Sequence, residues 1–144
     1  MTVLIQADGY QANQVQLGVS ANETVRHTVV LKPLPVNIDG LIRISRFQNL
    51  FDLSRVEIKA TNTQSPLDGS PIIVTAAPNG LFTLTNMPAS NANLTRTFNL
   101  RITHPDLQTV VITNVVAPRA GDCTIPLTIV MTPLTVDVTG TVLV

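Results

Sequence analysis

Apolar and polar residues alternate along most of this chain, which is the pattern of β-strands whose successive side chains point to opposite faces of a sheet. Residues 56–61 show it most clearly, with the apolar members expected to face a core and Glu57, Lys59 and Thr61 expected to face solvent. Further strands are expected at residues 3–7, 15–19, 25–31, 36–44, 72–75, 82–87, 98–103, 110–112 and 123–131. No window shows the period of a helix, so the sequence predicts an all-β protein.

Turn-forming residues separate these strands. Asp8-Gly9 and Asn22-Glu23 are two such points, residues 65–71 are dense in Pro, Gly and Ser, and the Asn-Gly pair within residues 78–80 suits a hairpin. Residues 47–53 are apolar without clear alternation, and we expect them to form a loop that packs inward. Short strands at this spacing are typical of a β-sandwich.

The chain also repeats itself. Residues 31–42 reappear as residues 131–142, with the Pro-Leu pair and the glycine of each copy in the same register. Self-similarity at a fixed period indicates an array of modules. We therefore expect residues 1–35 to be the C-terminal strands of an incomplete module, residues 36–135 to be a complete module, and residues 136–144 to be the first strand of the next.

In this interpretation, the segments at both ends of the chain need additional strands to pair with. Three strands at the N-terminus cannot close a two-layer core alone, and an apolar edge strand at the C-terminus can pair with another chain. The inter-module strand, a candidate donor strand, is expected to present Val136, Val138, Gly140 and Val142. Strand donation gives head-to-tail contacts that do not close, so copies of this chain are the expected partners in a homopolymer.

Residues 79–88 (Asn-Gly-Leu-Phe-Thr-Leu-Thr-Asn-Met-Pro) resemble the Asn-Gly-x-Phe-x-Leu-x-Asn-Val-Pro signature of carboxypeptidase regulatory-like (transthyretin-like) domains. Residues 7–11 (Ala-Asp-Gly-Tyr-Gln) are similar to the Gly-Tyr turn of the same modules, and residues 136–142 resemble their first strand. The resemblance covers most of residues 36–135. It implies an immunoglobulin/transthyretin-like antiparallel β-sandwich, commonly repeated in tandem in bacterial and archaeal surface proteins.

The chain departs from that family at two places. The second Gly-Tyr position is occupied by Asp106-Leu107, and residues 44–54 do not match the usual Gly-x-Pro-Leu-x-Gly-Ala turn. The matching motifs are short and specify a fold rather than a function, because one fold carries many functions.

The amino-acid composition limits the classes of binding partner that we expect. The chain of 144 residues is 44% hydrophobic and 3% aromatic, without Trp, so aliphatic and β-branched residues have to fill its core. Charged residues make up 12% and the formal net charge is zero, which argues against nucleic acid and anionic membranes because both need a basic surface. No run approaches the roughly 18 apolar residues that span a bilayer. So low a charge leaves a surface poorly protected against self-association.

Three residues are chemically reactive, and each is expected to be structural. His27 falls on the inward phase of its strand and is predicted to be half-buried, whereas His104 precedes Pro105 and is predicted to lie in a turn. Neither has the spacing of a metal ligand. Cys123 also falls on an inward phase and is predicted to be a small buried hydrophobe, with no base in evidence. With no nucleophile elbow and no phosphate loop, we expect no enzyme activity, metal or cofactor.

Two triplets satisfy the Asn-x-Ser/Thr rule for N-linked glycans, at Asn22 and Asn93, and both lie in expected turns that a transferase could reach. The alternative is chance, because a chain rich in Asn and Thr produces such triplets without selection. We expect an extracellular or cell-surface location.

These patterns favour a structural function. We expect a subunit or repeat segment of an extracellular filament or surface fibre, assembled head to tail through shared or exchanged β-strands. The alternative is a spacer or ligand-binding accessory module of a larger secreted or cell-surface protein, with residues 65–71 and 90–93 as candidate binding loops. Sugar binding is disfavoured by the scarcity of aromatic platforms, since Tyr10 is the single tyrosine.

Overall fold

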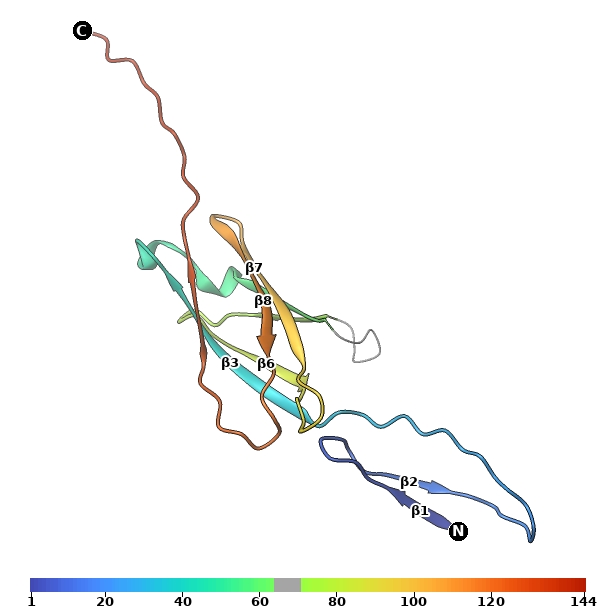
Figure 1. Cartoon of the computed structure of the whole chain (residues 1–144). Helices are drawn as coiled ribbons and strands as arrows, with labels where there is room; N and C mark the ends of the chain where they lie inside the picture. The colour runs from blue at the N-terminus through green and yellow to red at the C-terminus, as the bar shows by residue number, and fades with distance from the viewer. Residues whose placement is uncertain (64–70) are drawn as a thin grey trace.

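The computed structural model describes residues 1–63 and 71–144, and the all-β prediction is confirmed (Figure 1). The described strands form a two-stranded, a three-stranded and a four-stranded sheet, each containing antiparallel pairs. The strands are β1 (Thr2–Ile5), β2 (Asn13–Gln16), β3 (Pro35–Ile44), β4 (Glu57–Asn62), β5 (Ile72–Thr75), β6 (Leu81–Pro88), β7 (Thr97–His104), β8 (Leu107–Val116) and β9 (Leu127–Met131). Two single-turn 3-10 helices, Gln48–Leu50 and Leu53–Arg55, follow β3.

Strands β3 to β9 form the body of the molecule. The sheet with strand order β6-β3-β9 and the sheet with order β5-β4-β7-β8 bury one shared hydrophobic core. The largest fully buried side chains come from both sheets and from Val56, which directly precedes β4; those in the strands are Phe98, Ile42, Ile58, Leu84, Leu100, Ile102 and Met131. The expected inward phases of residues 56–61 and 98–103 are thereby confirmed.

The first and last strands of the body are neighbours. β3 pairs antiparallel with β6 and parallel with β9, with Gly40 opposite Leu127 and Ile44 opposite Met131. The ring of Phe82 packs over Gly40 in the middle of β3, and a Cβ at this position would fall 2.1 Å from Phe82 Cζ, so only glycine fits there without a shift of the ring. Alternation alone indicates that β3 is a strand but not that its partner runs parallel to it.

The N-terminal hairpin and the C-terminal tail lie outside the body (Figure 1). β1 and β2 pair antiparallel over four residue pairs, from Thr2–Gln16 to Ile5–Asn13. Residues 23–32 then run back toward the body, and they belong to no strand, so the strand expected at 25–31 is wrong. Residues 136–144 are extended and exposed and also belong to no strand. Both segments lack the neighbours that would complete a sheet. The module boundaries at residues 35 and 135 stay a prediction.

Two other local predictions differ from the structure, one of them only in part. Residues 48–50 and 53–55 form the two 3-10 turns. Leu53 is buried and Phe51 packs against the core as expected, whereas Phe47 and Leu50 are largely exposed. Cys123 is exposed in a segment that precedes β9, since the inward phase of that strand begins only at Leu127. A residue is buried by its phase only where a second sheet lies opposite, and the chain before β9 has none.

The two histidines exchange their expected environments. His27 is exposed, because the segment that holds it joins no sheet. His104 is instead buried as the last residue of β7. Its Nδ1 accepts a hydrogen bond from the Asp106 N–H (3.0 Å) and its Nε2 donates to the Asp52 carbonyl (3.1 Å), which fixes the tautomer. Of the turn expected at residues 65–71, all but Pro71 lies outside the described residues.

Candidate functional site

The most informative site is the junction at which the hairpin meets the chain that enters the body. The Gln11 N–H donates to the Lys32 carbonyl (2.8 Å), and the Leu34 N–H donates to the Gly9 carbonyl (2.9 Å). Between these bonds Tyr10 and Pro33 form an isolated antiparallel bridge. The hairpin turn is therefore attached by its backbone to the Pro-Leu segment, which we call the first junction.

The same arrangement recurs at the other end of the body. The Gln108 N–H donates to the Thr132 carbonyl (2.8 Å), and the Leu134 N–H donates to the Asp106 carbonyl (3.1 Å). Leu107 and Pro133 form the corresponding isolated antiparallel bridge. We call this the second junction. The two junctions share a backbone hydrogen-bond pattern although their side chains differ, so the Pro-Leu part of the sequence repeat has the same backbone arrangement at both ends of the body.

The body covers the first junction. The Leu34 carbonyl accepts a hydrogen bond from the Ala89 N–H (2.9 Å). Gly9 adopts a φ of +79°, and a Cβ there would lie 2.3 Å from the Cβ of Asn91. Only glycine fits both that backbone conformation and that approach. The hairpin turn and the loop after β6 are consequently in close contact.

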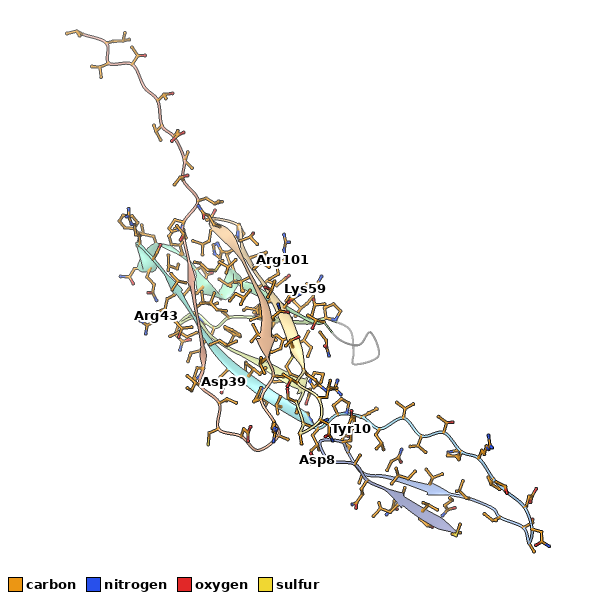
Figure 2. The ribbon with its side chains drawn as sticks, in the orientation of Figure 1. Asp8, Tyr10, Asp39, Arg43, Lys59 and Arg101 are labelled. Atoms are coloured by element: carbon orange, nitrogen blue, oxygen red, sulfur yellow. The ribbon has the colours of Figure 1, made fainter. Side chains whose placement is uncertain are left out.

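Tyr10 adds a side-chain contact at the same point (Figure 2). The guanidinium carbon of Arg96 lies 6.0 Å from the centre of the Tyr10 ring, and Arg96 Nη2 donates to the Tyr10 hydroxyl (3.4 Å). Arg96 is buried, so a cation–π contact of this kind counts for more than it would on an open surface. The single tyrosine of the chain thus joins the hairpin to the body.

The loop that receives the hairpin is itself fixed. Asn91 Oδ1 accepts hydrogen bonds from the backbone N–H groups of Asn93 (2.9 Å) and Leu94 (2.8 Å). The Ser90 hydroxyl donates to the Ala117 carbonyl (2.6 Å) and accepts from the Arg96 N–H (2.9 Å). Buried polar groups satisfied in this way hold a loop in one conformation.

The second junction has a different surface. Asp106 stands where the first junction has Gly9, and Leu107 stands where it has Tyr10. Leu107 is buried in the core of the body, whereas the exposed Asp106 carboxylate lies 3.9 Å from Arg55. Beside it, a surface hollow of about 470 Å³ is lined by Ser45, Arg46, Phe47, Thr132, Pro133, Leu134 and Thr135.

A carboxylate near the second junction is electrostatically distinctive. The pKa of Asp52 is lowered, first because its Oδ1 accepts a hydrogen bond from the Ser54 hydroxyl (2.6 Å) and then because it accepts another from the Ser54 N–H (3.1 Å). Arg55 and His104 contribute smaller coulombic effects in the same direction. The side chain caps a 3-10 turn and is exposed, so its arrangement fits a structural role.

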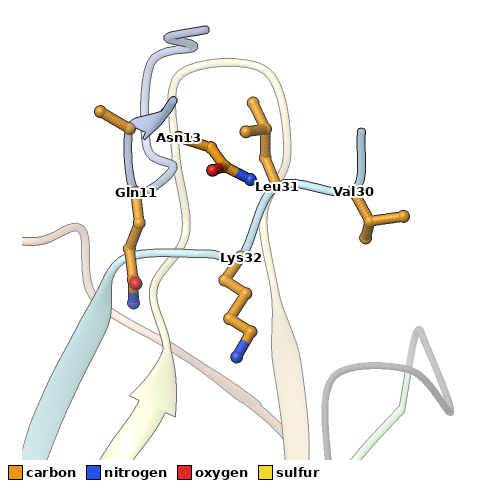
Figure 3. Close-up of a pocket in the computed structure, with 6 residues that line it drawn as sticks. Gln11, Asn13, Val30, Leu31 and Lys32 are labelled. Atoms are coloured by element: carbon orange, nitrogen blue, oxygen red, sulfur yellow. The ribbon is translucent and has the colours of Figure 1, made fainter. Parts of the chain in front are cut away.

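The segment that precedes the first junction leaves an open hollow beside the hairpin (Figure 3). The hollow measures about 210 Å³. Val30, Leu31 and Lys32 line it from the returning segment, and Gln11 and Asn13 line it from the hairpin. The returning segment is therefore not packed tightly against β2 along its length.

The glycosylation candidates are both exposed, in separate places. Asn22 lies in the turn after β2 with a φ of 65°, and Asn93 lies in the loop that receives the hairpin. Asn93 is two residues from Asn91, so a glycan there would stand beside the first junction. The four inter-module strand residues, Val136, Val138, Gly140 and Val142, are all exposed in the C-terminal tail.

The described residues contain no group of three or more His, Cys, Asp or Glu side chains placed to hold a metal ion. Among the same residues, no helix has the length and apolar character needed to cross a membrane. Sequence reasoning found the Pro-Leu repeat but missed the two junctions as structures, because the hydrogen bonds between residues 9–11 and 32–34 join positions far apart in the chain. No family model, curated protein or solved structure matches this chain.

Proposed function

We propose that this chain is a structural protein, a subunit or repeat segment of an extracellular or cell-surface filament whose β modules join head to tail through shared or exchanged strands. The observation that carries the proposal is the pair of matching junctions. A backbone arrangement that occurs before and after one folded body supports a construction in which module follows module with the same connection. The proposal includes no catalytic activity.

The finer fold belongs to the same proposal. Two sheets that bury one core support a β-sandwich, and the strand order favours one of the two topologies included in the expected fold class. An immunoglobulin domain pairs its first strand with its second, whereas the first strand of this body, β3, lies between β6 and β9. We therefore propose the transthyretin-like arrangement rather than the immunoglobulin one.

The surface supports assembly as well. Several large apolar side chains are exposed in the tail, among them Val136, Val138, Val142 and Leu143. Exposed apolar segments that can add to a sheet as strands are typical of surfaces that pair with another chain. The accessory-module alternative has less support, because Ser90 and Asn91, the first two residues of its candidate loop 90–93, are buried and hydrogen-bonded within the body.

The decisive experiment measures assembly of the purified chain. Sedimentation velocity over a hundredfold range of concentration, followed by negative-stain microscopy, should show growth into filaments with a regular axial repeat, because head-to-tail contacts do not close. A chain that sediments as one monomer at every concentration and forms no filaments would eliminate the proposal. Intact mass of natively secreted material tests the glycans at Asn22 and Asn93 in the same preparation.

A matched pair of glycine variants tests whether the junction sets the spacing. Gly9→Ala introduces a Cβ 2.3 Å from Asn91, whereas Gly121→Ala has a similar φ (+85° against +79°) but meets nothing within 4 Å. We expect only Gly9→Ala to release the hairpin from the body, seen as faster proteolysis between residues 16 and 35 and as irregular filament spacing. Equal effects of the two variants would mean that backbone strain, not the contact, is responsible.

A further inference from the structure

Two segments of this chain have repeat counterparts that pair with each other inside the body. Residues 136–144 are the counterpart of residues 36–44 in β3, and residues 27–31 are the counterpart of β9. In the body, β3 and β9 form a parallel pair over five consecutive residue partners, from Gly40–Leu127 to Ile44–Met131. The chain therefore contains a second pair of strand sequences that match an observed pairing.

The two counterparts do not meet within one molecule. In the part of the chain that the structure describes, neither segment belongs to a strand or makes a backbone hydrogen bond with another segment. Figure 1 shows them at opposite ends of the body, with the tail projecting away from the hairpin. Any pairing between them must join two molecules.

We propose that the C-terminal tail of one copy adds as a parallel strand beside residues 27–31 of a second copy. The register follows from the β3–β9 pair, which places Gly140 opposite His27, Val142 opposite Val29 and Val144 opposite Leu31 of the second copy. This inference rests on the proposed function and names the surface and the partner through which the modules join.

The chemistry of the two faces agrees with that register. Val142 and Val29 take the places of Ile42 and Ile129, both buried in the body, so these two side chains form the inner face. Leu143 and Val30 take the places of Arg43 and Val130, which are exposed. The paired strand also supplies backbone partners to peptide groups that lack them, which is the source of affinity in strand addition.

The occupant is a second copy because the chain already carries the complementary strand. Val29 and Leu31 are half-buried, and Val30 between them is exposed at the hollow of Figure 3. A parallel strand needs only an open edge and a matching alternation of apolar residues. Residues 136–144 provide that alternation, and their counterparts in β3 show that it is compatible with a parallel partner.

Disulfide cross-linking between different chains tests the register. In a Cys123→Ser background, one chain carries Val30→Cys and an isotopically labelled chain carries Leu143→Cys. Paired strands lie about 4.8 Å apart, within the separation that a disulfide spans, so mixing and mild oxidation should give a cross-linked dimer whose mass contains one chain of each kind.

The control shifts the register by one residue. A chain with Val29→Cys replaces the Val30→Cys chain, which puts the two thiols on opposite faces of the strand pair, and we expect a cross-link yield lower by about tenfold or more because adjacent residues in a strand point oppositely. Equal yields, or no mixed dimer from the in-register pair, would overturn the inference. All three substituted positions lie outside the core of the body, so far-UV circular dichroism should remain unchanged.

An aspartate introduced on the inner or the outer face of the proposed strand pair tests this inference separately from the proposed function. Val142→Asp would bury a carboxylate in the pairing, whereas Leu143→Asp would leave one in solvent, so only the first should reduce assembly strongly, by about tenfold or more. If the native chain forms filaments and both variants match it, the strand pairing is wrong and the filament proposal stands. If the native chain neither assembles nor cross-links, both are wrong.

Discussion

Residues 36–44 and residues 136–144 carry nearly the same alternation of apolar and polar residues, yet one is a central strand and the other is an exposed tail. Ile38 and Ile42 are 5% and 0% exposed, whereas their counterparts Val138 and Val142 are 91% and 89% exposed. The difference lies in the neighbouring strands: β3 pairs with β6 on one side and with β9 on the other, and the tail pairs with neither. A sequence with strand-forming residues therefore becomes a strand only where a neighbouring strand pairs with it.

The same difference separates β9 from its counterpart in the repeat, residues 27–31. Ile129 and Met131 are buried in β9, whereas Val29 and Leu31 are only half-buried in a segment that forms no strand. Leu31 lines an open hollow with Gln11, Ala12 and Asn13 of the hairpin, but the segment lacks the sheet partner that β3 provides for β9. Burial on one side, without a ladder of hydrogen bonds, leaves the segment extended but unpaired.

The largest expected difference between the two regions comes from removing one side chain at matched positions. Ile42→Ala should lower the free energy of unfolding of the body by about 2–5 kcal/mol, since it leaves a cavity in a packed core. Val142→Ala should change the same quantity by less than about 0.5 kcal/mol, as exposed substitutions do. Chemical denaturation followed by circular dichroism measures both. Similar losses would mean that the tail also packs against the body.

A smaller difference is expected from adding a methyl group at the two matched glycines. A Cβ at Gly40 would lie 2.1 Å from the ring of Phe82, whereas one at Gly140 meets nothing within 4 Å. Gly40→Ala should therefore destabilise the body by about 1–3 kcal/mol through overpacking, and Gly140→Ala should leave its thermal midpoint unchanged. A neutral Gly40→Ala would show that the Phe82 ring moves aside without cost.

The smallest effect concerns pH and the 3-10 turn near the second junction. Because hydrogen bonds from Ser54 lower the pKa of Asp52 below 3.8, this carboxylate stabilises the fold above that value, and the contribution is lost as the pH falls through the folded-state pKa. Ser54→Ala should raise the pKa of Asp52 and weaken this acid sensitivity, while Ser45→Ala serves as a control elsewhere on the same surface. Carboxyl NMR titration measures the shift, and an unchanged Asp52 pKa would contradict the assignment of its cause.

Buried residues were predicted correctly from the sequence where an alternating strand packs against a second sheet. The inward phases of β4 and β7 follow from Ile58, Ala60, Phe98 and Leu100, all of which the structure buries. The same reasoning placed Cys123 inside, where it fails because that stretch faces solvent and no sheet lies opposite it. Periodicity reports which residues share a face, but the fold decides whether that face is covered.

Only part of the candidate site could be predicted from the sequence. The Pro-Leu repeat located residues 33 and 133 as equivalent, which the matching hydrogen bonds of the two junctions support. The pairing of Arg96 with Tyr10 left no local signal, because the two residues are separated by most of the body in sequence. Contacts of such long range depend on topology, and alternation carries no information about it.

The parallel pairing of β3 with β9 has a mechanical consequence for any array built from this body. The chain enters at the start of β3 and leaves after β9, and because the two strands run in the same direction these points lie toward opposite poles of the sheet. Tension along the array would slide the two strands past each other, so their ladder is loaded in shear and its hydrogen bonds share the force together. An antiparallel first and last strand would instead be peeled apart one bond at a time.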